Sequence, residues 1–205
     1  MKYVYAVILS IFMLFGLWAY TGPSPAGPLD SHSVKISTEQ AHGSATHIGG
    51  GFFVTAQHVV VGVDTVTVKT NTGREVTADV LWSNKAHDVA LLRADIDGID
   101  ETGLDCRVPA VGEELKMRGN PLSLENITTW GVVAGLPDNY GQWRYAFPID
   151  GSLGAGMSGG GVFDDDDDLV GVIVGGVMVR YGMGGGPMGV GVIVPSSVVC
   201  MLMAR

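Results

Sequence analysis

The sequence predicts an all-β protein built from two packed barrels, with a short helix at the C-terminal end. Short runs rich in Val, Thr and Ile alternate with Gly, Pro, Asn and Asp, and sustained helical periodicity is scarce. The 31 glycines indicate many tight turns and bulges. The strand-rich part divides into two halves of about sixty to ninety residues, which are too small to form separate sandwiches.

The first half runs from Val34 to Asp95 and contains the strand-like segments HIGGGFFVTA, DTVTVKT, REVTADVLW and DVALLRA. The segment DIDGIDETGLDCRVPAVG breaks this pattern and predicts a connection between the halves. We therefore place an N-terminal barrel at 34–100 and a C-terminal barrel with its helix at 107–205. In the tail SSVVCMLMAR we expect Ser196 or Ser197 to cap that helix.

The N-terminal end predicts export from the cytoplasm. Residues 1–20 are almost continuously apolar after Lys2, and we expect them to form a hydrophobic helix whose length lies between that of a signal-peptide core and that of a membrane-spanning helix. Residues 21–33 are rich in Pro, Gly and Ser, which indicates an extended linker before a domain at 34–205. Lys2 on the inner side places the domain outside the cytoplasm, either anchored to a membrane or secreted into the periplasm or medium.

Charge and composition limit the partners. The formal net charge of -9 repels phosphate backbones, so we expect no nucleic-acid partner. His42 and His47 have no helical spacing or cysteine cluster that would support a metal site, and we expect neither a metal nor a cofactor. Cys106 and Cys200 are the two cysteines, and the sequence leaves open whether they pair or lie buried as separate thiols.

Three polar residues in different segments have the chemistry of nucleophilic catalysis. Ser158 lies in the glycine-rich stretch GAGMSGGGVF, and a serine needs a nearby base to become a nucleophile. His58 ends the apolar segment GGGFFVTAQH and can supply that base. Asp88 precedes the apolar run VALL, where a partly buried carboxylate needs a hydrogen-bonding partner. The chain order His, Asp, Ser is that of the chymotrypsin arrangement.

The glycines around Ser158 predict an oxyanion hole. A tight loop of small residues can direct two backbone N–H groups at the point where a tetrahedral oxyanion develops. Gly156 and Ser158 are the two donors that we expect.

The motifs TAQHVV, HDVALL and MSGGGVF…LVGVIVGG resemble the three catalytic segments of trypsin-like serine proteases. VGEELKMRGNPLSL, TTWGVVAG, PIDGSLGAGMSGG and GVGVIVPSS resemble, in the same order, segments of the HtrA/Deg branch. The resemblance covers the chain from Val34 onward. It implies a chymotrypsin-like fold of two packed six-stranded antiparallel β-barrels with the active site between them. It implies a serine endopeptidase that acts on polypeptides through an acyl-enzyme on Ser158, with His58 as general base and Asp88 orienting it.

This chain departs from the family at three points. Met157 stands where most relatives carry Asp or Asn, so activation by an ion pair with a new N-terminus is excluded and the support of the oxyanion loop is unknown. Val174 stands where digestive relatives often have a serine beside the catalytic carboxylate. Because the sequence ends at Arg205, we expect no PDZ domain and carry over no oligomeric state.

The resemblance also implies a substrate pocket. By alignment, Ser152 and Leu153 lie near its base, and Gly176 and Gly189 lie on its walls. No carboxylate occupies the floor position, although Asp150 is close in sequence, so we expect a preference for small or medium apolar residues such as Val, Ala or Leu.

Two other functions stay open on the sequence alone. If Met157 disables the oxyanion hole, the chain is a catalytically inactive protease-fold module, with a binding or structural role and tethered to a membrane. Alternatively, the apolar glycine-rich segment GGVMVRYGMGGGPMG docks a partner protein, because exposed apolar patches mark interaction sites.

Overall fold

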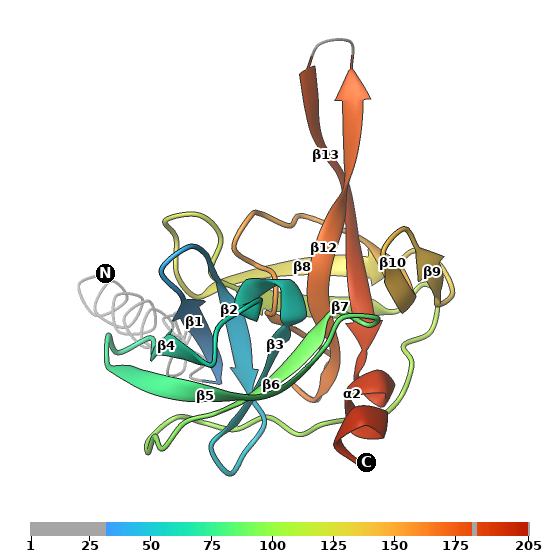
Figure 1. The fold of residues 1–205 in the computed structure, drawn as a ribbon. Helices are drawn as coiled ribbons and strands as arrows, with labels where there is room; N and C mark the ends of the chain where they lie inside the picture. The colour runs from blue at the N-terminus through green and yellow to red at the C-terminus, as the bar shows by residue number, and fades with distance from the viewer. Residues whose placement is uncertain (1–31, 182–183, 205) are drawn as a thin grey trace, which may run out of the picture.

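The computed structural model describes residues 32–181 and 184–204 (Figure 1). The predicted N-terminal helix at 1–20 and all but the end of the predicted linker at 21–33 lie outside these residues. Within the described part of the chain, no helix has the length and apolar character needed to cross a membrane.

Six antiparallel strands close the first barrel, in the order β1-β2-β3-β6-β5-β4 with β1 paired to β4. Side chains alternate between the two faces of each strand, and those that point inward fill the barrel. In β4, for example, Val66 and Val68 are buried while Thr65 is exposed. A 3-10 turn, η1, follows β3 directly. The elements are β1 (Ser33–Ser37), β2 (His42–His47), β3 (Phe52–Ala56), η1 (Gln57–Val60), β4 (Thr65–Lys69), β5 (Glu75–Asn84) and β6 (Val89–Arg93).

The second half forms one antiparallel sheet in the order β13-β12-β11-β7-β8-β10-β9. Because β10 also pairs with β13, six of these strands close a second barrel, and β9 is attached to its outside. Phe147, Ile149 and Met117 belong to its core. The strands are β7 (Glu114–Gly119), β8 (Ile127–Val133), β9 (Asp138–Tyr140), β10 (Trp143–Gly151), β11 (Gly161–Phe163), β12 (Leu169–Tyr181) and β13 (Gly184–Pro195).

The two barrels pack against each other through one shared apolar cluster. Val172 and Val174 on β12 and Val192 and Val194 on β13 join the buried residues of the first barrel in this cluster. The predicted fold of two packed six-stranded antiparallel barrels is therefore confirmed.

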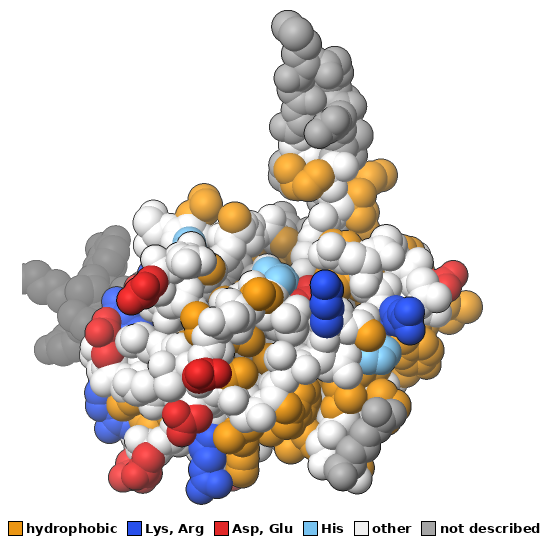
Figure 2. Space-filling model, viewed as in Figure 1, with side chains coloured by type: hydrophobic (Ala, Val, Ile, Leu, Met, Phe, Trp, Pro, Cys, Tyr) orange, Lys and Arg blue, Asp and Glu red, His pale blue; other side chains and the backbone are white. Residues whose placement is uncertain are grey.

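Strands β12 and β13 continue beyond the barrel as a long projecting hairpin (Figure 1). Figure 2 shows apolar side chains on this hairpin, and Met178 and Met188 are exposed there. The pairing of β12 with β13 shifts register near Gly175 and again near Val177, which is where the hairpin leaves the body.

The chain ends in helix α2 (Ser196–Met203), whose Val198 and Val199 pack into the shared apolar cluster. Cys106 and Cys200 form a disulfide, which joins the connection between the barrels to this helix. The prediction that a serine caps α2 is wrong: Pro195 occupies the N-cap position, and no side chain caps the helix. Ser196 instead donates its hydroxyl hydrogen bond to the carbonyl of Asp105.

Candidate active site

The structure brings His58 and Asp88 together. His58 lies on η1, where β3 ends, and Asp88 directly precedes β6, which pairs with β3. The Nδ1–H of His58 donates to Oδ2 of Asp88 at 2.8 Å, and the backbone N–H of His58 donates to Oδ1 at 2.8 Å. Asp88 is only 5% exposed and has a positive φ of 58°, a conformation that Asp tolerates better than most residues. Two hydrogen bonds from one residue thus fix the imidazole against the carboxylate.

Trp143 makes a third hydrogen bond to the carboxylate of Asp88, and no motif in the sequence indicates it. Its Nε1–H donates to Oδ2 of Asp88 at 2.9 Å. The indole lies against Gly175, where an added Cβ would come within 2.5 Å of Cζ2 of Trp143. A bare backbone on β12 therefore makes room for the ring. Val174 has no hydroxyl to offer Asp88, and the indole N–H of Trp143 supplies a hydrogen bond to this carboxylate from the second barrel.

Ser158 lies close to the segment that carries His58. A Cβ added to Gly159 would be 2.8 Å from the backbone nitrogen of Ala56, two residues before His58. A Cβ added to Gly43 would be 2.8 Å from the side chain of Val59 and 2.9 Å from the carbonyl oxygen of Ser158. Gly43 and Gly159 lie at this contact, and a side chain at either position would push the serine loop away from the histidine segment.

The serine and the histidine are not yet hydrogen-bonded to each other. Within residues 32–181 and 184–204, neither Oγ of Ser158 nor Nε2 of His58 takes part in a hydrogen bond. Because Nδ1 is occupied by Asp88, Nε2 is the nitrogen left to accept a proton from a hydroxyl. In substrate-free enzymes the nucleophile–base bond is often long and tightens only when substrate binds.

The loop before Ser158 holds four successive carbonyls by hydrogen bonds. The carbonyls of Ala155 and Met157 accept from the N–H groups of Leu122 at 2.7 Å and Gly160 at 2.8 Å. The carbonyl of Gly156 accepts from Oγ of Ser44 at 2.8 Å, and that of Ser158 accepts from the N–H of Ser44 at 2.8 Å.

The amides of Gly156 and Ser158 remain available. In the described part of the chain, neither N–H donates a hydrogen bond to another residue. In a trans peptide unit, N–H and C=O point in opposite directions. Because the carbonyls of Ala155 and Met157 are tied to Leu122 and Gly160, both N–H groups are turned away from those partners. Gly156 has φ +97°, which closes a turn from Gly154 to Met157 that a residue with a Cβ disfavours.

A hollow of about 420 Å³ opens beside Ser158, and its lining is mainly apolar. Two of the four predicted pocket residues, Leu153 and Gly176, line it together with Ser158. The other two do not line it: Ser152 is exposed, with its carbonyl accepting from Oγ1 of Thr129 at 3.1 Å, and a Cβ added to Gly189 would meet no atom within 4 Å. The further lining residues are Gly154, Ala155, Ile173, Gly175 and Met178.

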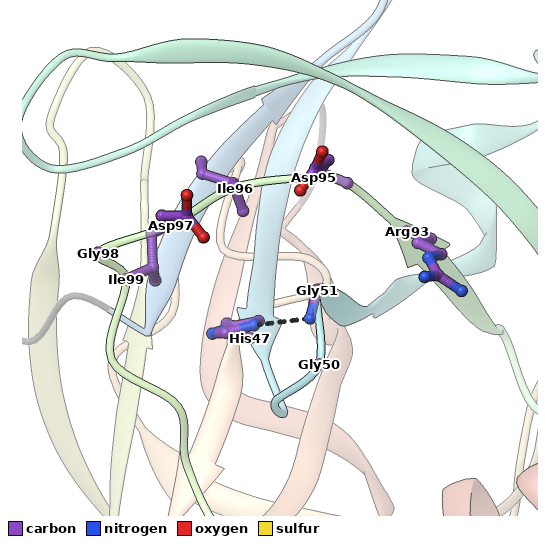
Figure 3. A pocket seen from close by; sticks show the side chains of 10 residues that line it. His47, Gly50, Gly51, Arg93, Asp95, Ile96, Asp97, Gly98 and Ile99 are labelled. Carbon is purple, nitrogen blue, oxygen red and sulfur yellow. Dashed lines mark hydrogen bonds between the residues drawn. The ribbon is translucent and has the colours of Figure 1, made fainter.

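A second hollow, of about 550 Å³, has none of the predicted catalytic residues in its lining. Asp95, Ile96 and Asp97 follow β6 along one side of it, and His47 lies across from them (Figure 3). His47 uses both ring nitrogens within the fold, since Nδ1 contacts the carbonyl of Asp100 at 3.0 Å and Nε2 accepts from the N–H of Gly51 at 3.3 Å. His47 therefore supports this corner of the first barrel. Across the described residues, no group of three or more His, Cys, Asp or Glu is placed to hold a metal ion.

Two packed six-stranded barrels, a His–Asp pair at the end of a strand of the first and a serine in a glycine-rich loop of the second define the chymotrypsin-like class. Comparison with known proteins agrees with this class. A model of the trypsin-like peptidase domain family matches residues 43–172. The chain therefore belongs to this family.

Individual relatives point to one branch of the family. The chain is 30% identical over 125 residues to the "Probable periplasmic serine endoprotease DegP-like" of Halomonas elongata, covering 60% of this chain and 26% of that protein. It is 27% identical over 152 residues to the "Periplasmic pH-dependent serine endoprotease DegQ" of Escherichia coli, covering 72% and 32% respectively. The chain thus spans about a third or less of these relatives.

Solved structures support the fold. The HtrA-type protease AlgW with a tripeptide superposes with a TM-score of 0.75 at 23% identity, over 85% of this chain and 60% of the other. A serine endoprotease from Yersinia pestis gives a TM-score of 0.72 at 21% identity, over 86% and 62%.

Proposed function

We propose that this protein is a serine endopeptidase of the HtrA/Deg type, in which Ser158 is the nucleophile, His58 the general base and Asp88 the carboxylate that orients it. The observation that carries the proposal is the hydrogen bond of 2.8 Å from Nδ1–H of His58 to Asp88, on a segment packed against the Ser158 loop. Asp88 fixes the tautomer that leaves Nε2 free as a base and stabilises the imidazolium that forms.

The reaction follows from these positions. Nε2 of His58 takes the proton of the Ser158 hydroxyl while Oγ bonds to the scissile carbonyl carbon, and the carbonyl oxygen becomes an oxyanion. Collapse of this intermediate breaks the C–N bond, and the imidazolium returns its proton to the leaving amine. A water molecule then attacks the acyl-enzyme by the same route, with His58 again as base, and releases the acid and free Ser158.

The N–H groups of Gly156 and Ser158 stabilise the oxyanion. Their lack of partners within the described fold and their direction, opposite to carbonyls tied to Leu122 and Gly160, support this role. Removing one such donor costs about 2.7–4 kcal/mol of transition-state stabilisation in enzymes of this kind. Met157 is therefore compatible with an oxyanion hole, which argues against the inactive-module alternative.

The hollow beside Ser158 receives the side chain that precedes the scissile bond. Its lining by Leu153, Ile173 and Met178, with no carboxylate, favours small or medium apolar residues over Lys or Arg. Asp150, which complicated this prediction, lies exposed on β10 outside the lining.

The substrate class is polypeptide and the location is outside the cytoplasm. An exported location is supported by the relatives, because the DegP-like protein and DegQ are both named as periplasmic. The apolar segment at 1–20 either holds the domain at a membrane or is removed after export.

Hydrolysis of unfolded casein by the purified protein tests this function. Wild type should release peptides, while Ser158→Ala and His58→Ala should each lose activity by about 10³-fold or more and keep the same thermal unfolding. Ser123→Ala, at an exposed serine, is the matched control and should keep full activity. A folded wild-type protein that cleaves nothing would favour the binding-module alternative.

A further inference from the structure

Ser44 connects the first barrel to the loop that carries the proposed oxyanion donors. It lies on β2 and is fully buried, with 0% exposure. Its N–H donates to the carbonyl of Ser158 at 2.8 Å, and its Oγ–H donates to the carbonyl of Gly156 at 2.8 Å. One residue of the first barrel therefore holds two carbonyls of the catalytic loop in the second.

The Ser44 hydroxyl is itself oriented by the end of β7. The backbone N–H of Asn120 donates to Oγ of Ser44 at 2.8 Å, which directs the hydroxyl proton toward Gly156. The side chain of Asn120 is held in turn, because Nδ2 donates to the carbonyl of Val34 at 3.0 Å and Oδ1 accepts from the N–H of Asn126 at 3.0 Å. All donors and acceptors around this buried hydroxyl are thus satisfied.

The bond to Gly156 acts on the peptide unit between the two donors. The carbonyl of Gly156 belongs to the unit 156–157, whereas the proposed donor N–H groups belong to units 155–156 and 157–158. The orientation of the central unit depends on the dihedral angles of Gly156 and Met157, so fixing it restrains both neighbouring units. Gly156 has the widest conformational freedom of any residue type and most needs such a restraint.

The side chain of Met157 does not orient the carbonyl of Gly156. This side chain is 1% exposed and packs in the core of the second barrel, so it anchors the loop by apolar contact. A thioether is only a weak acceptor and forms no ion pair, so it does not set the direction of a carbonyl.

We propose that Ser44 is a positioning residue of the peptidase, whose hydroxyl holds the Gly156 carbonyl so that the N–H groups of Gly156 and Ser158 converge on the oxyanion. This hydrogen bond takes the place of the ion pair that zymogen-type relatives form with the acidic residue at the position of Met157. This inference rests on the proposed function.

Ser44→Ala tests the inference, with Thr46→Val as a matched control. Thr46 lies on the same strand and is also buried, but its Oγ1 has no hydrogen-bond partner within the described chain. With a chromogenic peptide amide, Ser44→Ala should lower kcat by about tenfold or more, up to the 10²–10³ that loss of a whole donor causes. KM and the pH dependence of kcat/KM should stay unchanged, since the pocket and the His58–Asp88 pair are intact. Thr46→Val should stay within about twofold of wild type in kcat.

Inhibition by a peptidyl boronate distinguishes a role in positioning the oxyanion donors from a purely structural role. Its tetrahedral adduct places an oxygen in the oxyanion hole, so Ser44→Ala should weaken its inhibition by the same factor as kcat. Binding of the corresponding product peptide to Ser44→Ala should match wild type. If Ser44→Ala does not fold, Ser44→Cys fills the site with a weak donor and should show the same losses.

The outcomes separate the inference from the function on which it rests. An active wild type with Ser44→Ala equally active, or with the loss entirely in KM, would overturn the role of Ser44 and leave the peptidase intact. Failure of both Ser44 variants to fold would make Ser44 a general core residue and would also overturn it. A folded wild type with neither turnover nor labelling of Ser158 would overturn both proposals.

Discussion

The indole of Trp143 donates a hydrogen bond of 2.9 Å to the same carboxylate oxygen of Asp88 that binds Nδ1 of His58. Trp143 lies on β10 of the second barrel, whereas His58 and Asp88 belong to the first. The carboxylate that orients the proposed base is therefore held from both sides of the interface between the barrels, and alignment of the barrels sets the geometry of the pair.

Trp143→Phe should weaken catalysis while preserving the fold. The change keeps an aromatic ring but removes the N–H, which leaves a buried carboxylate with one acceptor position less satisfied. Hydrogen bonds to charged groups contribute about 1.5–3 kcal/mol, so kcat/KM should fall by about 10- to 100-fold. The measurement is peptide hydrolysis beside Trp130→Phe, a change at an exposed tryptophan that should have no effect. Equal rates for the two variants would show that the indole does not support Asp88.

Gly156→Ala should lower activity strongly and should also destabilise the loop. The added Cβ would come within 2.6 Å of the carbonyl oxygen of Asn120, and φ +97° strains any residue other than glycine. The loop should shift and displace the Gly156 N–H, which lowers kcat by about 10² or more. Gly141→Ala is the control, because it also has a positive φ, at +61°, but its added Cβ meets no atom within 4 Å. Full activity in Gly156→Ala would contradict the assignment of this donor.

The disulfide should contribute to stability and not to catalysis. It joins Cys106 to Cys200, 94 residues apart, and neither cysteine lines the hollow at Ser158. Replacing both cysteines by serine should lower the free energy of unfolding by about 2–5 kcal/mol. Urea unfolding measures this change, and peptide hydrolysis at a temperature where the variant is folded should match wild type. A large loss of kcat in the folded double variant would be inconsistent with this view.

The ion pair between Arg107 and Glu113 should make the free energy of unfolding depend on pH in the acidic range. The guanidinium of Arg107 donates two hydrogen bonds to Glu113, at 2.9 and 2.6 Å, and these bonds hold the pKa of the Glu113 carboxyl below its ordinary value. Because the pKa is lower in the folded state, the stabilisation is present above the unfolded-state pKa of about 4.3 and is lost as the pH falls through the folded-state value.

Glu113→Gln tests whether the stabilisation by this ion pair is lost as the pH falls. At neutral pH it should lower the free energy of unfolding by about 0.5–1 kcal/mol, a modest value because both side chains are partly exposed and screened by solvent. The difference from wild type should shrink as the pH is lowered below about 4. Urea unfolding at several pH values gives the measurement, and Glu39→Gln, at an exposed glutamate, is the control. A difference that is the same at every pH would exclude the ionised pair as its source.

The sequence predicted the barrels and supplied the candidate catalytic residues because the signals for both are local. Short apolar strands between glycines indicate β-structure wherever they occur, and His58, Asp88 and Ser158 each lie in a segment with its own motif. Trp143 and Ser44 were missed because their hydrogen bonds to Asp88 and Gly156 join residues far apart in the chain. Each looks like an ordinary strand residue until the fold brings it to Asp88 or to Gly156.

Two other differences have physical causes. Ser196 was expected to cap α2, but its hydroxyl binds the carbonyl of Asp105, since the disulfide at Cys106 brings that segment to the helix. The four predicted pocket residues divide between the hollow beside Ser158 and other positions, because alignment cannot show which face of a twisted, bulged strand looks into a hollow. Leu153 and Gly176 face the hollow, whereas Ser152 does not line it.

Reaction with a fluorophosphonate tests the central claim most directly, because this reagent modifies only a serine that a neighbouring base activates beside an oxyanion hole. We expect the folded wild-type protein to gain one phosphonyl group, mapped by mass spectrometry to Ser158, and His58→Ala to react far more slowly. A folded wild-type protein that remains unmodified, or that is modified at another residue, would contradict the account.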